Sequence, residues 1–262
     1  MPTSDPDVFW LGSVASLLAG LGTSLGAAAI YLFRRPSERT IDGLVSGAAG
    51  IMLAASFFSL LEPAVEYAER QVDHAALGVL LVIAGVFIGA LGLFYIHRHV
   101  PHEHFLLGKE GPENRRLSRL ALFVIAITLH NFPEGMAVGV GFAGEDVANG
   151  ISLGIGIGLQ NIPEGLAVAI SLLAIGYRQS TAFWVGSLTG LVEPVGGVIG
   201  AAAIWLAEPL MPIILGIAAG AMLFIISDEI IPETHRGGYE NVATFSLLGG
   251  ISLMVFLDVL LA

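Results

Sequence analysis

The chain of 262 residues contains no cysteine and few charged residues. Without cysteine, it can form neither a disulfide bond nor a thiolate metal site. Charged residues make up only 13% of the sequence, against 55% hydrophobic residues, and the mean hydropathy is +0.82. A soluble globule of this length needs far more polar surface, so the composition excludes that class. The sequence therefore predicts an all-α membrane protein.

Apolar segments joined by short connections fill the chain. A helix needs about 20 apolar residues to cross a bilayer. The first segment follows no basic region and is longer than the apolar core of a signal peptide, which indicates a retained span. We expect one domain, residues 1–262, with residues 98–117 forming a histidine-containing cytoplasmic loop. The eight predicted transmembrane helices are 9–33, 41–61, 75–97, 118–142, 148–175, 181–206, 209–231 and 241–262.

The basic residues predict the orientation, because loops that stay in the cytoplasm collect Lys and Arg. Ten of the 11 basic residues fall in connections on one side of the predicted spans, and only Arg70 falls on the other. Both termini are therefore expected on the outer side. The expected location of the protein is the inner or plasma membrane. Acidic residues outnumber Arg70 on the outer face, which either attracts cations to the outer mouth or only solubilises the loops.

A pattern of Asn, any residue, Pro, Glu and Gly occurs twice within apolar segments, as HNFPEG at 130–135 and QNIPEG at 160–165. An ionisable residue at a helix centre costs roughly 2.5 to 3.5 kcal/mol on insertion scales, so its repeated placement indicates a polar site. Residues three and four apart share one face of a helix, which aligns His130 or Asn131 with Glu134. Pro133 and Pro163 leave backbone carbonyls without their usual partner beside this face.

The two motifs lie on consecutive spans, which cross in opposite directions and thus predict an inverted repeat around a site at the bilayer midplane. Glu193 lies next to Pro194 in the sixth span and adds a third carboxylate. Like charges in low dielectric raise one another's pKa, which a bound divalent cation relieves. The candidate ligands are His130, Asn131, Glu134, Gln160, Asn161, Glu164 and Glu193.

Nitrogen and oxygen donors without sulfur suit Zn²⁺ first, and then Fe²⁺, Mn²⁺ or Cd²⁺. Glu134 and Glu164, facing each other, are suited to bridge two metal ions. An intramembrane metalloenzyme is one alternative, because His and Glu near a metal can activate water. It is less favoured, because the motif lacks the His-Glu-x-x-His arrangement of zinc proteases. A proton- or sodium-coupled carrier of an organic solute remains an alternative, in which the glutamates titrate.

The motifs HNFPEGMAVGV and QNIPEGLAVAI, with the EPVGG and DEIIPETH segments, resemble the ZIP (Zrt/Irt-like) metal transporters, GufA-like bacterial members in particular. The resemblance covers all eight spans and implies import of divalent metal, chiefly zinc, through a binuclear site. It assigns one position to His130, Glu134, Gln160 and Glu164, and the other to Asn131, Asn161 and Glu193 with both bridging glutamates.

The resemblance also implies an elevator-like motion of spans one, four, five and six against the others, and a homodimer. Some relatives carry histidine or aspartate at the positions of Gln160 or Asn161, so we expect the second position to bind metal less firmly. The other expected partners are the lipid bilayer and the transported divalent ions. No nucleic-acid partner is expected.

Two further polar clusters fall on the predicted cytoplasmic side. A histidine-rich tract of this kind predicts either a loose acceptor of arriving metal or only a solvated loop. Its members are His97, His99, His102 and His104. The second cluster, at the inner end of the seventh span, predicts either ligands on the exit path of the metal or ordinary polar residues at the membrane boundary. Its members are Asp228, Glu229, Glu233 and His235.

Overall fold

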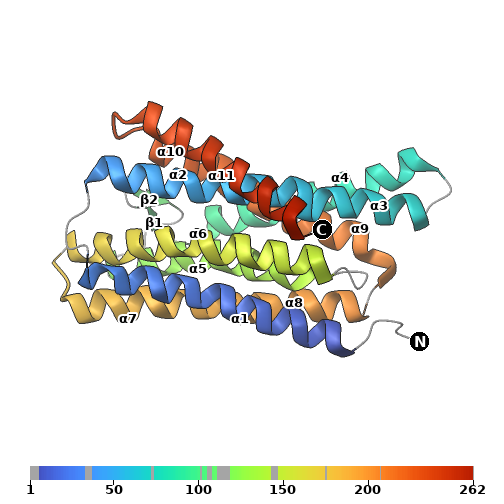
Figure 1. The fold of residues 1–262 in the computed structure, drawn as a ribbon, viewed down its shortest axis with the longest axis horizontal. Coiled ribbons are helices and arrows are strands. Elements are labelled where there is room, and N and C mark those ends of the chain that lie inside the picture. The colour runs from blue at the N-terminus through green and yellow to red at the C-terminus, as the bar shows by residue number, and fades with distance from the viewer. Residues whose placement is uncertain are drawn as a thin grey trace.

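The structure, a computed structural model, is a long bundle of helices (Figure 1). It describes residues 6–32, 37–71, 74–100, 102–104, 108–110, 119–142, 147–174, 176–206 and 208–261. The α-helices are α1 (Pro6–Ala28), α2 (Glu38–Ala55), α3 (Glu62–Gln71), α4 (Ala75–His99), α5 (Arg119–Val140), α6 (Val147–Ala174), α7 (Gln179–Thr189), α8 (Glu193–Leu206), α9 (Met211–Ile225), α10 (Ile231–Thr234) and α11 (Glu240–Leu261).

Seven helical segments of the described part are long and apolar enough to cross a membrane. They are Val8–Tyr31, Glu38–Gln71, Ala75–His99, Val147–Leu173, Gln179–Ala203, Met211–Thr234 and Glu240–Leu260. The prediction of a helical, multi-pass membrane protein is therefore confirmed. Helix α5 occupies the place of the remaining predicted span, 118–142, without being among these seven, so the count of eight stays a prediction.

Three of the spans change helical geometry partway along. The π-helix η2 (Ser56–Leu61) joins α2 to α3, the 3-10 helix η4 (Gly190–Val192) joins α7 to α8, and the π-helix η6 (Ile226–Ile230) joins α9 to α10. The segment that follows each one carries proline as its second residue, and proline lacks the N–H that would continue the helical hydrogen-bond pattern. The further 3-10 helices of the described part are η1 (Ala29–Tyr31) and η5 (Glu208–Leu210).

These prolines explain two differences from the predicted boundaries. The second span, predicted to end at residue 61, continues through Pro63 to Gln71. The seventh, predicted to end at residue 231, continues through Pro232 to Thr234. In both places a π-helix absorbs the change of geometry before the proline, so the helix does not stop.

The connection predicted as the loop 98–117 contains elements that the sequence analysis did not expect. Helix α4 continues to His99, and strands β1 (His102–His104) and β2 (Gly108–Glu110) pair antiparallel, with Glu103 opposite Lys109. His99, which was predicted to lie in the loop, therefore belongs to a helix, as His97 was predicted to do. These two short strands are the departure from an all-helical fold among the described residues.

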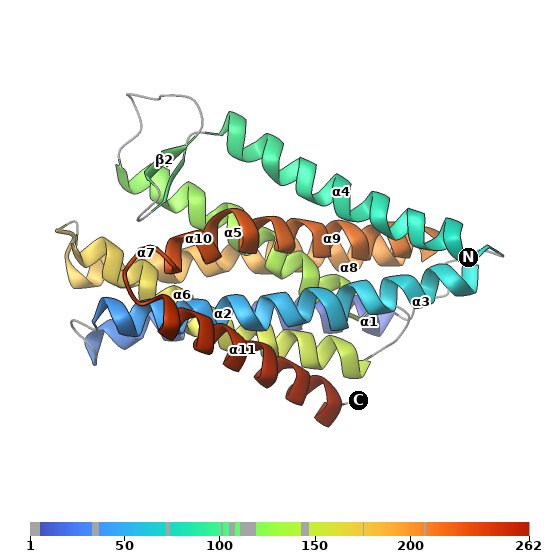
Figure 2. The same ribbon diagram turned by 90° about the horizontal axis from the view of Figure 1, so that it is seen from above.

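The helices form two groups that pack more closely within themselves than across (Figures 1 and 2). In the first, named the site bundle, α1 packs along α6 and α8, and α5 packs along α8, with α7 leading into α8. In the second, named the support bundle, α2 packs along α11, α4 packs along α9, and α3 and α10 complete the group. The candidate ligands on α5, α6 and α8 thus all lie in the site bundle.

Glycines bring helix backbones into direct contact inside each bundle. A Cβ added at these glycines would collide with the backbone of the neighbouring helix, so a larger residue cannot keep the same spacing. Such pairs are Gly22 with Gly158, Gly50 with Leu247, and Gly89 with Ile217. Across the two bundles, Gly156 of α6 instead faces the side chains of Met254 and Ile51.

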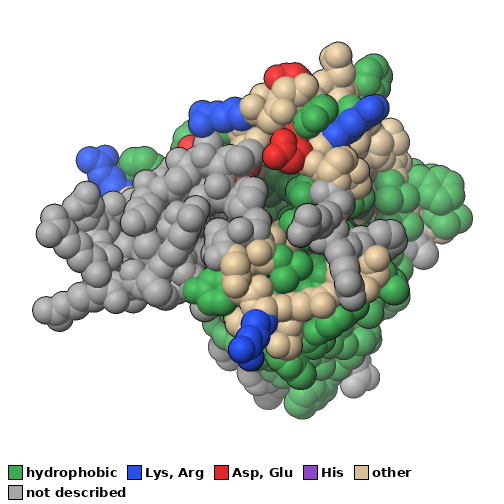
Figure 3. Space-filling view, turned by 90° about the vertical axis from the view of Figure 1, so that its left-hand side faces the viewer, with side chains coloured by type: hydrophobic (Ala, Val, Ile, Leu, Met, Phe, Trp, Pro, Cys, Tyr) green, Lys and Arg blue, Asp and Glu red, His purple; other side chains and the backbone are tan. Residues whose placement is uncertain are grey.

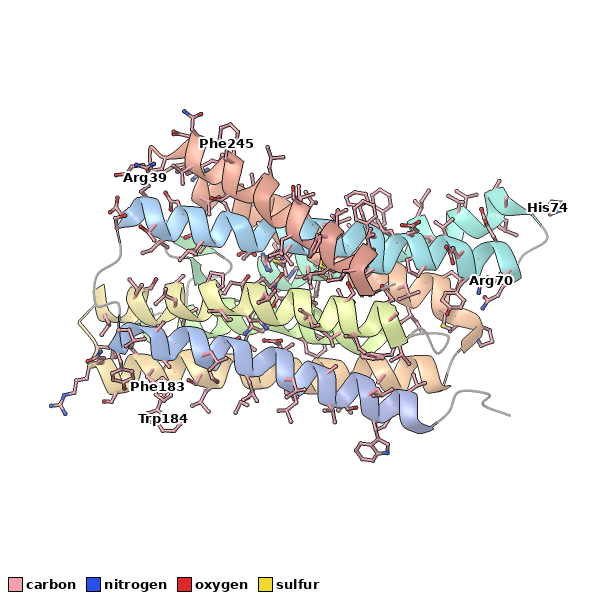
Figure 4. The ribbon with its side chains drawn as sticks, viewed as in Figure 1. Arg39, Arg70, His74, Phe183, Trp184 and Phe245 are labelled. Carbon is pink, nitrogen blue, oxygen red and sulfur yellow. The ribbon has the colours of Figure 1, made fainter. Side chains whose placement is uncertain are left out.

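The flanks of the molecule are apolar and its ends carry charge. Trp184 and Phe245, which are 62% and 74% exposed, point away from the bundle (Figure 4). Arg39 and Arg70 lie at opposite ends of the long axis (Figure 4). Viewed from the Arg39 end, basic and acidic side chains surround the end, and hydrophobic side chains cover the flank below (Figure 3). This distribution fits a protein whose long axis crosses a bilayer.

Candidate functional site

The two motifs lie inside long helices rather than at their ends. Residues 130–135 belong to α5 and residues 160–165 lie in the middle of α6, with Pro133 and Pro163 within the helices. Glu193 is the first residue of α8, directly after η4, and so it lies in the middle of the span Gln179–Ala203. Glu164 and Glu193 therefore lie well inside their spans, and Glu134 lies within α5, six residues before its end.

The glycine that ends each motif explains why these helices meet at the glutamates. Gly135 lies against the backbone of Glu193, and Gly165 lies against the backbone of Thr23 in α1. A Cβ at either position would overlap a carbonyl group of the neighbouring helix. The motif thus places an acid and a proline beside a backbone contact that only glycine permits.

Hydrogen bonds from two neighbouring helices hold the Glu193 carboxylate. The side-chain nitrogen of Asn161 lies 2.9 and 2.8 Å from its two oxygens, and donates as well to the carbonyl of Ala19 at 2.9 Å. The Thr23 hydroxyl donates to one of the same carboxylate oxygens at 3.3 Å. Glu193 and Asn161 are fully buried and Thr23 is nearly so. The site therefore satisfies Glu193 without any ion.

Other polar atoms of the site have no such partner. Several buried side-chain oxygens and nitrogens make no hydrogen bond of standard geometry with the described residues. A buried polar group without a partner costs about 1 to 3 kcal/mol, and more if it is charged. These atoms are Asn131 Oδ1, both carboxylate oxygens of Glu134, Oε1 and Nε2 of Gln160, and Asn161 Oδ1. A set of unsatisfied oxygens at membrane depth is what a site for a transported cation requires.

The structure brings some of the remaining predicted ligands close to Glu193. Glu134 lies close enough to Glu164 and Glu193 for their charges to interact, and Gln160 lies beside it. Glu164 is partly buried. His130 lies in α5, but its side chain is outside the described residues. Among the described side chains, no three His, Asp or Glu residues come close enough together to hold a metal ion.

The predicted histidine cluster and exit cluster meet at one point in the support bundle. Nε2 of His97 lies 3.1 Å from Oε1 of Glu229, and both side chains are almost completely buried. The His97 ring also packs edge-on against Phe224, with ring centroids 5.4 Å apart. The sequence analysis had placed these two residues in different clusters.

Two other histidines of those clusters contact different groups. His99 stacks on Tyr95 with ring centroids 4.0 Å apart, and His235 lies within hydrogen-bonding distance of Thr244 and the carbonyl of Ile231. The side chains of His102 and His104 are outside the described residues. Asp228 is exposed and Glu233 is partly buried.

The structure also contains polar contacts that sequence reasoning missed. Thr23 of α1 contacts Glu193 of α8, and the signal in the sequence was a pair of hydroxyl residues, Thr23 and Ser24, among the glycines of the first apolar segment. A second group links the two bundles: Ser152 of α6 donates to Asp258 of α11 at 3.2 Å, and Asn149 of α6 donates to the carbonyl of Ser59 in η2 at 3.0 Å. These bonds lie near the beginning of α6.

Apolar spans that enclose three carboxylates and unsatisfied amide oxygens define a multi-pass membrane transporter. Comparison with known proteins gives the family. The family described as ZIP Zinc transporter matches residues 99–258. The chain belongs to this family, whose members are transporters and not enzymes, so the resemblance is confirmed and the metalloenzyme alternative is excluded.

Named relatives match over almost the whole chain. Zinc transporter GufA of Myxococcus xanthus is 46% identical over 247 residues, which cover 94% of this chain and 97% of the relative. Zinc transporter ZIPB of Bordetella bronchiseptica is 43% identical over 248 residues, 95% of this chain and 79% of the relative. Human zinc transporter ZIP11 is 33% identical, and the match covers 90% of this chain and 93% of the relative.

Proposed function

We propose that this protein carries divalent metal ions, zinc foremost, across the membrane into the cytoplasm. The observation that carries the proposal is the set of buried, unsatisfied oxygens around Glu134, in the middle of the apolar spans. The names of the relatives, zinc transporters from bacteria to human, support the choice of metal. Cd²⁺, Fe²⁺ and Mn²⁺ are expected to compete, because the donors are oxygen and nitrogen without sulfur.

The metal ion is the substrate of this site. The family resemblance implies two positions that share Glu134 and Glu164, one completed by His130 and Gln160. We assign transport to this first position, because Glu193 of the other position already accepts hydrogen bonds from Asn161 and Thr23. The second position would involve Asn131, Asn161 and Glu193. Asp228, Glu229, Glu233 and His235 are proposed for the exit path, and His97, His99, His102 and His104 for capture of metal at the inner end.

Alternating access fits the division into two bundles. Backbone contacts at glycines tie the helices within a bundle, so each bundle would move as one body, whereas Gly156 meets the other bundle through flexible side chains. The site bundle comprises the spans that the resemblance implies as the moving unit, and the eight spans with their inverted repeat belong to the same proposal. A sliding motion would open the site alternately to the two sides of the membrane.

Localisation and assembly complete the proposal. We place the chain in the inner or plasma membrane with both termini outside, as one eight-span domain whose inner face includes residues 98–117. Because the chain lacks cysteine, a single cysteine replacing His74 can be labelled selectively. An impermeant reagent should reach it from outside in intact cells, and protection there would reverse the orientation. Cross-linking in the membrane should yield a homodimer.

The test of the site is zinc uptake by variants of the two shared glutamates. Glu134→Ala or Glu164→Ala should lower uptake far more than about tenfold, since loss of even an outer-shell metal partner costs about 10- to 100-fold in affinity. Glu69→Ala removes an exposed glutamate of α3 and should leave uptake unchanged. Each variant must reach the membrane in the parent amount. Full uptake by both site variants would refute the proposal.

A further inference from the structure

The orientation of the Asn161 amide is set by its surroundings. Three acceptors lie within 2.9 Å of the nitrogen: the two oxygens of Glu193 and the carbonyl oxygen of Ala19. Reversing the amide would place an oxygen against three oxygens, so the nitrogen must face them. The amide nitrogen carries two hydrogens for three acceptors, so one hydrogen is shared between two oxygens. The side-chain oxygen of Asn161 points elsewhere and has no partner among the described residues.

The Asn161 amide therefore satisfies the Glu193 carboxylate, as a bound cation would. The oxygens of a buried carboxylate need either a cation or several hydrogen-bond donors. Glu193 receives them from Asn161 at both oxygens and from the Thr23 hydroxyl at one. Glu134 receives none of standard geometry from the described residues. Two buried glutamates in one site thus differ: one is already held by the protein, and the other is open to an ion.

We propose that Asn161 is a positioning residue that holds the Glu193 carboxylate and so keeps the second metal position closed. The site would then carry one divalent ion at a time, bound at the position of Glu134. This inference rests on the proposed function and refines it. An ion that used Glu193 would first have to displace an amide 2.8 and 2.9 Å from its oxygens.

Aspartate at position 161 has almost the same shape as asparagine, but it would repel the Glu193 carboxylate instead of donating hydrogen bonds to it. Asn161→Asp replaces the donating nitrogen by an oxygen, which would face the Glu193 oxygens at the same short distances. Carboxylate oxygens at these distances repel each other unless a cation lies between them. The variant should therefore gain an ion that the parent does not bind.

The experiment counts zinc ions that depend on Glu134. Purified full-length protein is dialysed against zinc, and bound metal per chain is measured by elemental analysis. Subtracting the count for Glu134→Ala removes ions held elsewhere, for example near the histidines at the inner end. The parent should lose one ion on this substitution. Asn161→Asp should lose two on the same substitution, and Asn161→Asp with Glu193→Gln should return to one, because the second ion needs both carboxylates.

Two results would overturn the inference. A parent that loses two ions on Glu134→Ala has an open second position, and a folded Asn161→Asp protein that loses only one has not gained it. If Asn161→Asp fails to fold, the number of ions bound by the parent still tests the inference by itself. A parent that loses no ion at all contradicts the proposed metal site itself. If the parent transports zinc and binds two ions that depend on Glu134, the proposed function stands and only the proposed role of Asn161 is wrong.

Discussion

The glycines that end the two motifs should be as important as the glutamates before them. Gly135→Ala and Gly165→Ala each add one methyl group where the backbone of Glu193 or Thr23 already lies within its radius. Ordinary contact needs 3.4 to 4 Å, and a helical backbone cannot yield as a side-chain end can. The helices must separate, which overpacking data put at about 1 to 3 kcal/mol. The separation would also draw Glu134 or Asn161 away from Glu193.

Thermal unfolding of the purified protein in detergent measures this cost. At about 2 to 4 °C per kcal/mol for a chain of this size, the midpoint should fall by roughly 2 to 12 °C. Gly249→Ala is the matched control, because Gly249 lies in α11 with nothing within 4 Å of an added methyl group. There alanine should stabilise the helix by about 0.5 to 1 kcal/mol. If Gly135→Ala and Gly165→Ala unfold no earlier than Gly249→Ala, the reasoning about backbone contact is wrong.

Three further predictions follow from individual contacts. His130→Ala should shift the transport preference from zinc toward harder ions such as Mn²⁺, because it removes a nitrogen donor; an unchanged competition profile would argue against His130 as a ligand. Glu229→Leu removes the partner 3.1 Å from buried His97 and should cost about 1 to 3 kcal/mol in thermal unfolding, most of it recovered by adding His97→Phe; a double variant no more stable than Glu229→Leu would count against the pair. Ser152→Ala breaks a 3.2 Å hydrogen bond between the bundles, and should speed labelling from outside of a single cysteine replacing Ile157; equal labelling rates would show that this bond does not hold the outer side closed.

The sequence predicted the spans well because the bilayer requires long apolar segments whatever their neighbours. The predicted spans 148–175 and 241–262 agree with α6 (Val147–Ala174) and α11 (Glu240–Leu261) within one residue at each end. The errors fall at Pro63 and Pro232: the predicted spans stop just before these prolines, whereas the helices continue through them. Whether a proline ends a helix depends on the turn before it, and a π-helix there lets the chain continue.

It was harder to predict which residues of the site contact each other than to predict which residues belong to it. Glu134, Asn161 and Glu193 were identified because polar residues at membrane depth are expensive. Which of them pair was not predictable, because lipid-facing and buried positions are both apolar in a membrane helix and give no face to orient it. Asn161 therefore counted as a ligand, although its nitrogen holds Glu193. His97 and Glu229 were separated in the same way, since about 130 residues of sequence lie between them.

Uptake of radioactive zinc into proteoliposomes tests the central claim most directly. Parent protein and Glu164→Ala are reconstituted at equal density, and uptake is measured against zinc concentration with Cd²⁺, Fe²⁺ and Mn²⁺ as competitors. We predict saturable uptake by the parent that the variant loses, with the competitors ranked by their inhibition. No uptake by folded parent protein, or solute uptake that needs no metal, would contradict a metal transporter and favour a solute carrier.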